Sequence, residues 1–193
     1  MIDLSSPATR LAGIVGQVQD DQLDDATPCP DYTVAGLLDH IVGFCDAFTA
    51  GAMKQSSGPG PAGPSGSAEG LVAGWRLEIP ERLAGLAEAW SSPDAWEGMT
   101  VVAGVDLPGE QAGLFALDEI VMHGWDLAQA TGQSFEIDDE ALGPLEQLLV
   151  PLAAPEMAEI RDNLFGPIVH APGGGTRVDQ VLGLAGRGPA WQR

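Results

Sequence analysis

One stretch of the sequence carries three side chains that can hold a metal ion or a proton. Glu119, His123 and Asp126 follow one another at spacings of four and three residues. On a helix these spacings place the side chains over one face, so a carboxylate and an imidazole can reach the same point. Zinc accepts such nitrogen and oxygen ligands at about 2.0–2.2 Å. The pattern therefore indicates a metal site, although an ordinary Glu–His surface pair has the same spacing.

Apolar residues surround this stretch, which favours the metal site over the surface pair. A helix is predicted over residues 110–131, and Asp118 and Gln129 form a polar strip on it that can face solvent. Buried charged groups need partners or a metal. We therefore expect Glu119, His123 and Asp126 to face the interior. The apolar positions of the predicted helix are Leu114, Phe115, Leu117, Ile120, Val121, Met122, Trp125 and Leu127.

A third ligand is expected from a second helix, which begins after Thr33, a good N-cap residue. His40 lies at the edge of the apolar stripe of that helix, next to Ile41, so it faces a seam between helices. Two facing helices of a bundle fix ligand geometry well, and three protein ligands leave an open position, as in catalytic zinc sites. The sequence thus predicts a divalent ion, zinc first and nickel as the alternative. Its predicted ligands are His40, Glu119 and His123, with Asp126 in support.

The rest of the pattern is mostly helical. Further helices are predicted over residues 6–19, 68–90, 138–152 and 155–165, and Pro80 should kink or split the second of these. A hairpin is expected over residues 100–107, around Ala103-Gly104. Residues 55–67 have the composition of a flexible loop, and residues 165–193 that of an irregular C-terminal extension. We expect a mainly α fold, a four-helix bundle with a small β-hairpin, in one domain over residues 1–193.

The charge balance excludes some partners. The 193-residue chain has 28 acidic and 8 basic residues, a formal net charge of −20, and no basic cluster. Nucleic acid and anionic membrane surfaces repel such a chain. We find no signal peptide and no apolar run of about 18 residues, and so expect a cytoplasmic protein with small-molecule partners. Cys29 and Cys45 make neither a disulfide framework nor a metal motif.

Three motifs resemble one family. Residues 27–40, TPCPDYTVAGLLDH, resemble the T-P-C-P-x-[WY]-T-V-x-x-L-L-x-H segment of DinB-like metal-binding proteins, in their mycothiol-dependent maleylpyruvate isomerase branch. Residues 119–131, EIVMHGWDLAQAT, are similar to the E-x-x-x-H-x-x-D-L helix of that branch. Residues 186–191 resemble its C-terminal signature, with Gly188 in place of the usual acid or amide.

This resemblance implies a DinB-like four-helix bundle in which water completes the coordination of the metal. It implies a thiol transferase or isomerase that uses mycothiol or a similar low-molecular-weight thiol on a small electrophile, and it allows a homodimer. Asp126 would then hold a water, orient a ligand or act as a base. Arg82 and Arg187, with Arg76, are candidates for binding the thiol or an anionic substrate. The alternative is a non-catalytic protein that binds or senses a small ligand through its metal.

Overall fold

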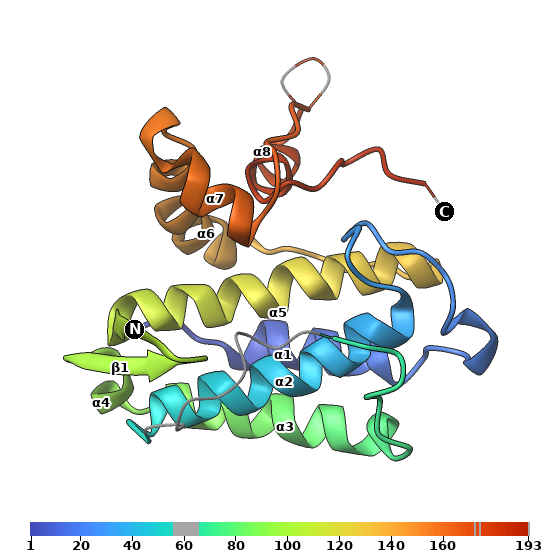
Figure 1. Ribbon diagram of the computed structural model, residues 1–193, viewed down its shortest axis with the longest axis horizontal. Coiled ribbons are helices and arrows are strands. Elements are labelled where there is room, and N and C mark those ends of the chain that lie inside the picture. The colour runs from blue at the N-terminus through green and yellow to red at the C-terminus, as the bar shows by residue number, and fades with distance from the viewer. Residues whose placement is uncertain (56–65, 172, 174, 193) are drawn as a thin grey trace. The chain divides into compact units, whose positions relative to one another are not determined.

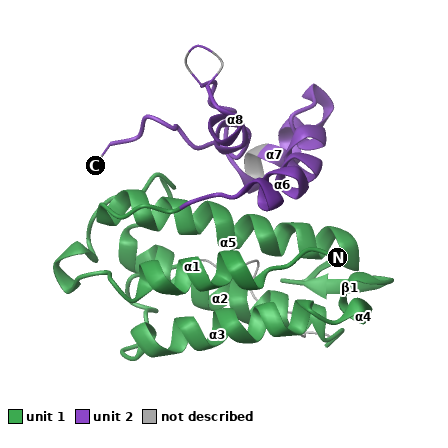
Figure 2. Cartoon of the chain, turned by 180° about the vertical axis from the view of Figure 1, so that it is seen from behind, with its two compact units in different colours: residues 1–135 green, residues 136–193 purple. Residues whose placement is uncertain are grey.

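The structure is a computed structural model that describes residues 1–55, 66–171, 173 and 175–192. Its contacts divide the chain into two compact units, Met1–Phe135 and Glu136–Arg193 (Figure 2). The predicted mainly α fold with a small hairpin is confirmed. The single domain over residues 1–193 stays a prediction. The flexible loop expected at residues 55–67 lies, from 56 to 65, outside the described residues.

Four helices build the first unit: α1 (Ser5–Val15), α2 (Val34–Ala52), α3 (Trp75–Trp90) and α5 (Gly109–Thr131). Both α1 and α2 pack against α3 and α5, so the four helices enclose one core (Figure 1). Removing apolar side chains from water in this way is the main stabilising term of such a bundle. The fully buried side chains include Leu11, Val15, Leu37, Ile41, Phe44, Ile79, Leu83, Leu86, Leu117 and Ile120. A short 3-10 turn, η1 (Asp20–Gln22), and α4 (Pro93–Trp96) lie in the connections.

The second helix, α2, is the centre of this core. Its predicted cap is confirmed, because the Thr33 hydroxyl accepts the Gly36 backbone N–H at 3.3 Å. Of the helices in the described part of the chain, α2 is the one long and apolar enough to cross a membrane, by length and composition alone. Core helices of bundles pass the same test, and 61% of the tested window is buried inside the fold. The helix packs here as a core element of the bundle.

The third helix begins later than predicted, at Trp75 instead of residue 68. The Ser67 N–H donates to Asp39 Oδ2 at 3.0 Å, and a Cβ at Gly70 would lie 2.6 Å from the same oxygen. The segment before α3 is therefore held against α2, and the helix begins beyond it. The helix then runs through Pro80 as one element, so the predicted split does not occur.

The predicted hairpin is confirmed. The strands β1 (Met99–Val102) and β2 (Val105–Pro108) are antiparallel, with Val102 opposite Val105. The two turn residues between them, Ala103 and Gly104, have φ values of 49° and 83°. Positive φ at both central residues is what the tightest right-twisting hairpin turn requires. The fifth helix, α5, follows β2 directly at Gly109 and carries the carboxylates and histidine singled out above.

The second unit contains α6 (Asp139–Leu152), η2 (Pro155–Met157), α7 (Ala158–Leu164) and α8 (Arg177–Leu184). Within it, α6 packs against both α7 and α8. Asp138 caps α6 by accepting the Ala141 N–H at 3.1 Å, and Thr176 with Asp179 forms a capping box at the start of α8. Side chains that accept the first amides of a helix fix where it begins. The predicted helix at 138–152 is confirmed, and α8 adds a helix within the extension that was expected to be irregular.

Candidate metal centre

Two helices of the bundle bring three sequence-predicted ligands together. On α5, Glu119 Oε2 lies 3.1 Å from His123 Nε2, one helical turn further along. On α2, His40 Nε2 lies 3.1 Å from the same Glu119 oxygen. Within the described residues, these three make up the group whose potential ligand atoms all lie within 4.8 Å of one another. The expected convergence of α2 and α5 is therefore present in the fold.

Each imidazole is held from behind by a second residue. His123 Nδ1 lies 3.0 Å from Asp126 Oδ2, and the Asp126 side chain is fully buried. His40 Nδ1 lies 3.3 Å from the Tyr32 hydroxyl. With both Nδ1 atoms engaged, the two Nε2 atoms are the ones that meet at Glu119. Of the three roles open to Asp126, the geometry supports orientation of a ligand.

The three potential ligands differ in their exposure to solvent. The His40 and His123 side chains are 8% and 9% exposed, whereas the Glu119 side chain is 27% exposed. The two rings stand nearly perpendicular, at 82° with centroids 4.6 Å apart, and Phe44 packs against both of them. This packing fixes the ring orientations. Glu119 is therefore the most exposed of the three potential ligands, while the aromatic side of the cluster is packed.

The charges in the cluster are strongly coupled. Burial on its own raises the pKa of Glu119, but hydrogen bonds from His123 and His40 outweigh it and leave that pKa well below its ordinary value. Burial likewise lowers the pKa of His123, but its bonds to Asp126 and Glu119 prevail and raise that pKa to about 9. Near neutral pH the metal-free cluster thus holds Glu119 as the anion and a proton on His123. A bound cation would replace that proton as the positive charge.

The donor set fits a divalent metal. Two histidine nitrogens and one glutamate oxygen, with a fourth position open, are a ligand set that catalytic zinc sites use. Ligand atoms at 2.0–2.2 Å around a tetrahedral zinc lie about 3.4 Å from one another, close to the 3.1 Å that separates Glu119 Oε2 from each histidine nitrogen. All three potential ligand atoms lie within 4.8 Å of one another, so the side chains would have to close in around an ion.

Arg82 and Arg76 are engaged elsewhere on the first unit. Arg82 forms ion pairs with Asp46 and, at 3.5 Å, with Glu78. Arg76 donates to Asp20 Oδ1 at 2.6 Å and lies over the ring of the neighbouring tryptophan. Both guanidinium groups are therefore paired with carboxylates: Arg82 joins α3 to α2, and Arg76 joins α3 to η1. A role in thiol binding stays a prediction for each of them.

Three other residues with chemically active side chains fall outside the cluster. Arg187 belongs to the second unit, where it is buried and donates to the Ala185 carbonyl at 2.7 Å. His170 also belongs to that unit and lines a mostly apolar cavity beside Ile168 and Leu184. Burial raises the pKa of the Cys45 thiol far above its ordinary value, so this cysteine stays neutral. The role of Arg187 in binding a thiol stays a prediction.

Tyr32 is a site residue that pattern reasoning missed. It lies in the turn before α2, within the segment that resembles the family motif, and its ring stacks on that of His40. A residue outside any periodic helix pattern gives no sign of which way its side chain points. The one sequence feature that pointed to Tyr32 was its position within that motif, eight residues before His40.

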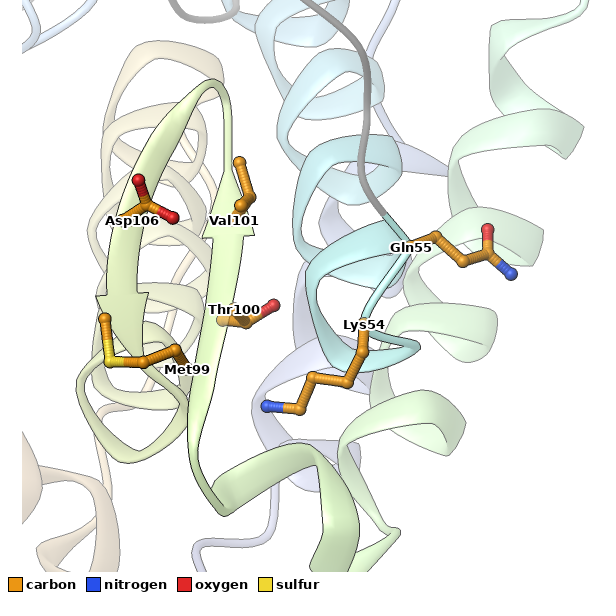
Figure 3. Close-up of a pocket in the computed structure, with 6 residues that line it drawn as sticks. All are labelled: Lys54, Gln55, Met99, Thr100, Val101 and Asp106. Carbon is orange, nitrogen blue, oxygen red and sulfur yellow. The ribbon is translucent and has the colours of Figure 1, made fainter.

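A shallow pocket at the hairpin is separate from the cluster (Figure 3). It lies between the end of α2 and the strands, and the Lys54 amino group beside it donates to the carbonyls of Ala95 and Glu97, at 2.9 Å each. That lysine is thus a tether between α2 and the segment before the hairpin. The pocket is lined by Lys54, Gln55, Met99, Thr100, Val101 and Asp106.

Comparison with known proteins places this geometry in a family. Residues 4–128 match the model of the mycothiol maleylpyruvate isomerase N-terminal domain. Two uncharacterised proteins of Mycobacterium tuberculosis, from strains H37Rv and CDC 1551, are each 29% identical over 163 residues, which is 84% of this chain and 77% of theirs. Their similarity extends beyond the bundle into the second unit.

A solved structure shares the fold. The crystal structure of the mycothiol-dependent maleylpyruvate isomerase superposes with a TM-score of 0.54 at 19% identity, over 74% of this chain. The chain spans 64% of the length of that protein. The family match covers most of this chain and includes His40, Glu119 and His123. The chain belongs to the mycothiol maleylpyruvate isomerase N-terminal domain family.

Proposed function

We propose that this protein binds a divalent metal, zinc first, through His40, Glu119 and His123, and acts as a thiol transferase or isomerase. One observation carries the proposal. The potential ligand atoms of these three residues, from α2 and α5, lie within 4.8 Å of one another, and the Glu119 side chain is 27% exposed. The proposed cosubstrate is mycothiol or a similar low-molecular-weight thiol, and the second substrate is a small electrophile. A cytoplasmic location belongs to the same proposal.

The chemistry needs a thiol in its anionic form. When bound, a metal of this kind lowers the pKa of a thiol that coordinates it, and so supplies a nucleophile at neutral pH. The protein residues prepare this site: Glu119 stays anionic because of its two histidine neighbours, and Asp126 holds the His123 ring in place. The Glu119 side chain is 27% exposed, so we propose that the substrates approach the metal from this side.

Family membership supports the choice of thiol. The matched family and the solved structure both carry mycothiol in their names. Because this chain spans only 64% of the solved isomerase, and the likeness shows the fold alone, we leave the electrophile at the level of a class. An electrophilic carbon that a thiolate can attack is the requirement.

Thiol consumption tests this proposal. Zinc-loaded protein with mycothiol and 1-chloro-2,4-dinitrobenzene should form the S-aryl adduct and release chloride at least about tenfold faster than metal-stripped protein, because the reactive thiolate is then populated at neutral pH. Adduct absorbance gives the rate, and mass spectrometry identifies the product. Tight binding of the thiol without adduct would support a non-catalytic ligand-binding protein instead. If the protein neither binds the thiol nor forms the adduct, both functions are contradicted.

Asp126→Asn should weaken zinc binding by about 10–100-fold, the usual effect of losing a carboxylate that orients a ligating histidine. The amide has nearly the same shape, so the buried site keeps its packing. Competition with a chromophoric chelator measures the affinity. Asp118→Asn is the matched control: Asp118 was expected to face solvent, but the fold buries it on α5, outside the cluster. Equal affinities for Asp126→Asn and the parent protein would remove the orienting role.

A further inference from the structure

The Tyr32 side chain contacts both histidines of the cluster. Its ring stacks on His40 with centroids 4.9 Å apart and planes 26° apart, and it meets the edge of His123 at 6.3 Å. Its hydroxyl lies 3.3 Å from His40 Nδ1, the ring nitrogen that faces away from Glu119. The position of this hydroxyl matches that of Asp126 behind the other imidazole.

The direction of the hydrogen bond between Tyr32 and His40 follows from which His40 nitrogen binds the metal. If His40 Nε2 is to hold a metal, the proton of the neutral ring must be on Nδ1. That N–H then has the Tyr32 oxygen as its acceptor, because a phenol oxygen can accept as well as donate. We propose that Tyr32 is a positioning residue of the metal centre, whose hydroxyl fixes the orientation and the tautomer of His40. This inference rests on the proposed metal-dependent function.

A second contact fixes the hydroxyl itself. Burial raises the pKa of Tyr32, and a hydrogen bond from the Gly66 backbone acts in the opposite direction. The backbone at Gly66 lies so close to α2 that a Cβ there would be 2.0 Å from the Gly36 carbonyl oxygen and 2.8 Å from His40 Cβ. The next amide, that of Ser67, is bound by Asp39. The Tyr32 oxygen is thus held between this segment and His40, and so its acceptor atom is already in place before a metal binds.

Tyr32→Phe isolates the hydroxyl, because phenylalanine keeps the ring that stacks on His40. Zinc affinity, measured by chelator competition on the full-length protein, should fall about 10–100-fold. Asp31→Asn, at the exposed neighbouring position of the same turn, is the matched control and should bind zinc within about twofold of the parent protein. Circular dichroism melts check that each variant is folded.

Nitrogen-15 NMR of the histidines gives a readout that packing alone does not move. The chain has three histidines, so the zinc-loaded spectrum is simple. The His40 Nδ1–H signal should shift and exchange faster with water in Tyr32→Phe, while the His123 signal stays unchanged. Unchanged zinc affinity and an unchanged His40 signal in Tyr32→Phe would overturn the inference and leave the metal centre standing. A parent protein that binds no zinc would overturn the proposed function, and the inference with it.

Discussion

His123→Ala and His40→Ala should each leave a folded protein that no longer binds stoichiometric zinc. Zinc sites with four protein ligands bind with about 10–16 kcal/mol, roughly 3 kcal/mol per ligand, so loss of one of three ligands should cost a hundredfold or more in affinity. Each variant also leaves a carboxylate, Glu119 or Asp126, with one fewer partner. Elemental analysis of the purified proteins, beside the parent, measures metal content.

His170→Ala is the matched control for these variants. It removes the third histidine of the chain, which lies in the second unit and outside the cluster, and should keep about one zinc per chain. A melting experiment separates loss of metal from loss of fold. Full metal content in both cluster variants would show that the ligand assignment is wrong. Absence of metal from the parent protein, even after reconstitution, would remove the proposed mechanism.

Zinc affinity should rise about tenfold for each pH unit between roughly 6.5 and 9, and level off above that range. The metal-free cluster keeps a proton on His123, whose pKa is raised to about 9, and this proton must leave when the cation binds. Over the whole interval the gain amounts to a few hundredfold. Isothermal titration in two buffers of different ionisation enthalpy should show close to one proton released per zinc at pH 7.

The stability of the metal-free protein should change in the opposite direction over the same interval. A histidine whose pKa is higher in the folded than in the unfolded state stabilises the fold below the unfolded value, near 6.5, and loses this effect as the pH rises through about 9. The loss is at most about 3 kcal/mol. Chemical denaturation at pH 6.5 and 9.5, with and without zinc, measures both effects. Zinc affinity that is independent of pH would contradict the protonated cluster.

Local sequence rules determined a large part of this molecule. Glu119, His123 and Asp126 share a face because helical geometry fixes the direction of side chains three and four residues apart. The Thr33 cap and the turn at Ala103-Gly104 depend only on neighbouring residues, and both are present as predicted. These features follow from the backbone periodicity and from turn chemistry. They can be predicted from the local sequence, whatever tertiary contacts the segment makes.

Only the tertiary structure decided how the segments meet. His40 and Glu119 are separated by 79 residues and come together because α2 and α5 pack in the bundle core. The side chain of Tyr32 follows no periodic pattern, so its bond to His40 appears only when the turn is folded. Arg82 was a candidate for binding the thiol, and the fold pairs it with Asp46 because α2 and α3 are neighbours.

The start of α3 is another feature on which the local sequence and the tertiary structure differ. The apolar pattern extended back to residue 68, but in the fold the Ser67 N–H is bound by the Asp39 carboxylate of α2, and α3 begins only at Trp75. Local sequence thus specified which residues can share a face, through the fixed geometry of helices and turns. The choice of partner across the core depends on packing between elements distant in the chain, and spacing along one element carries no information about that packing.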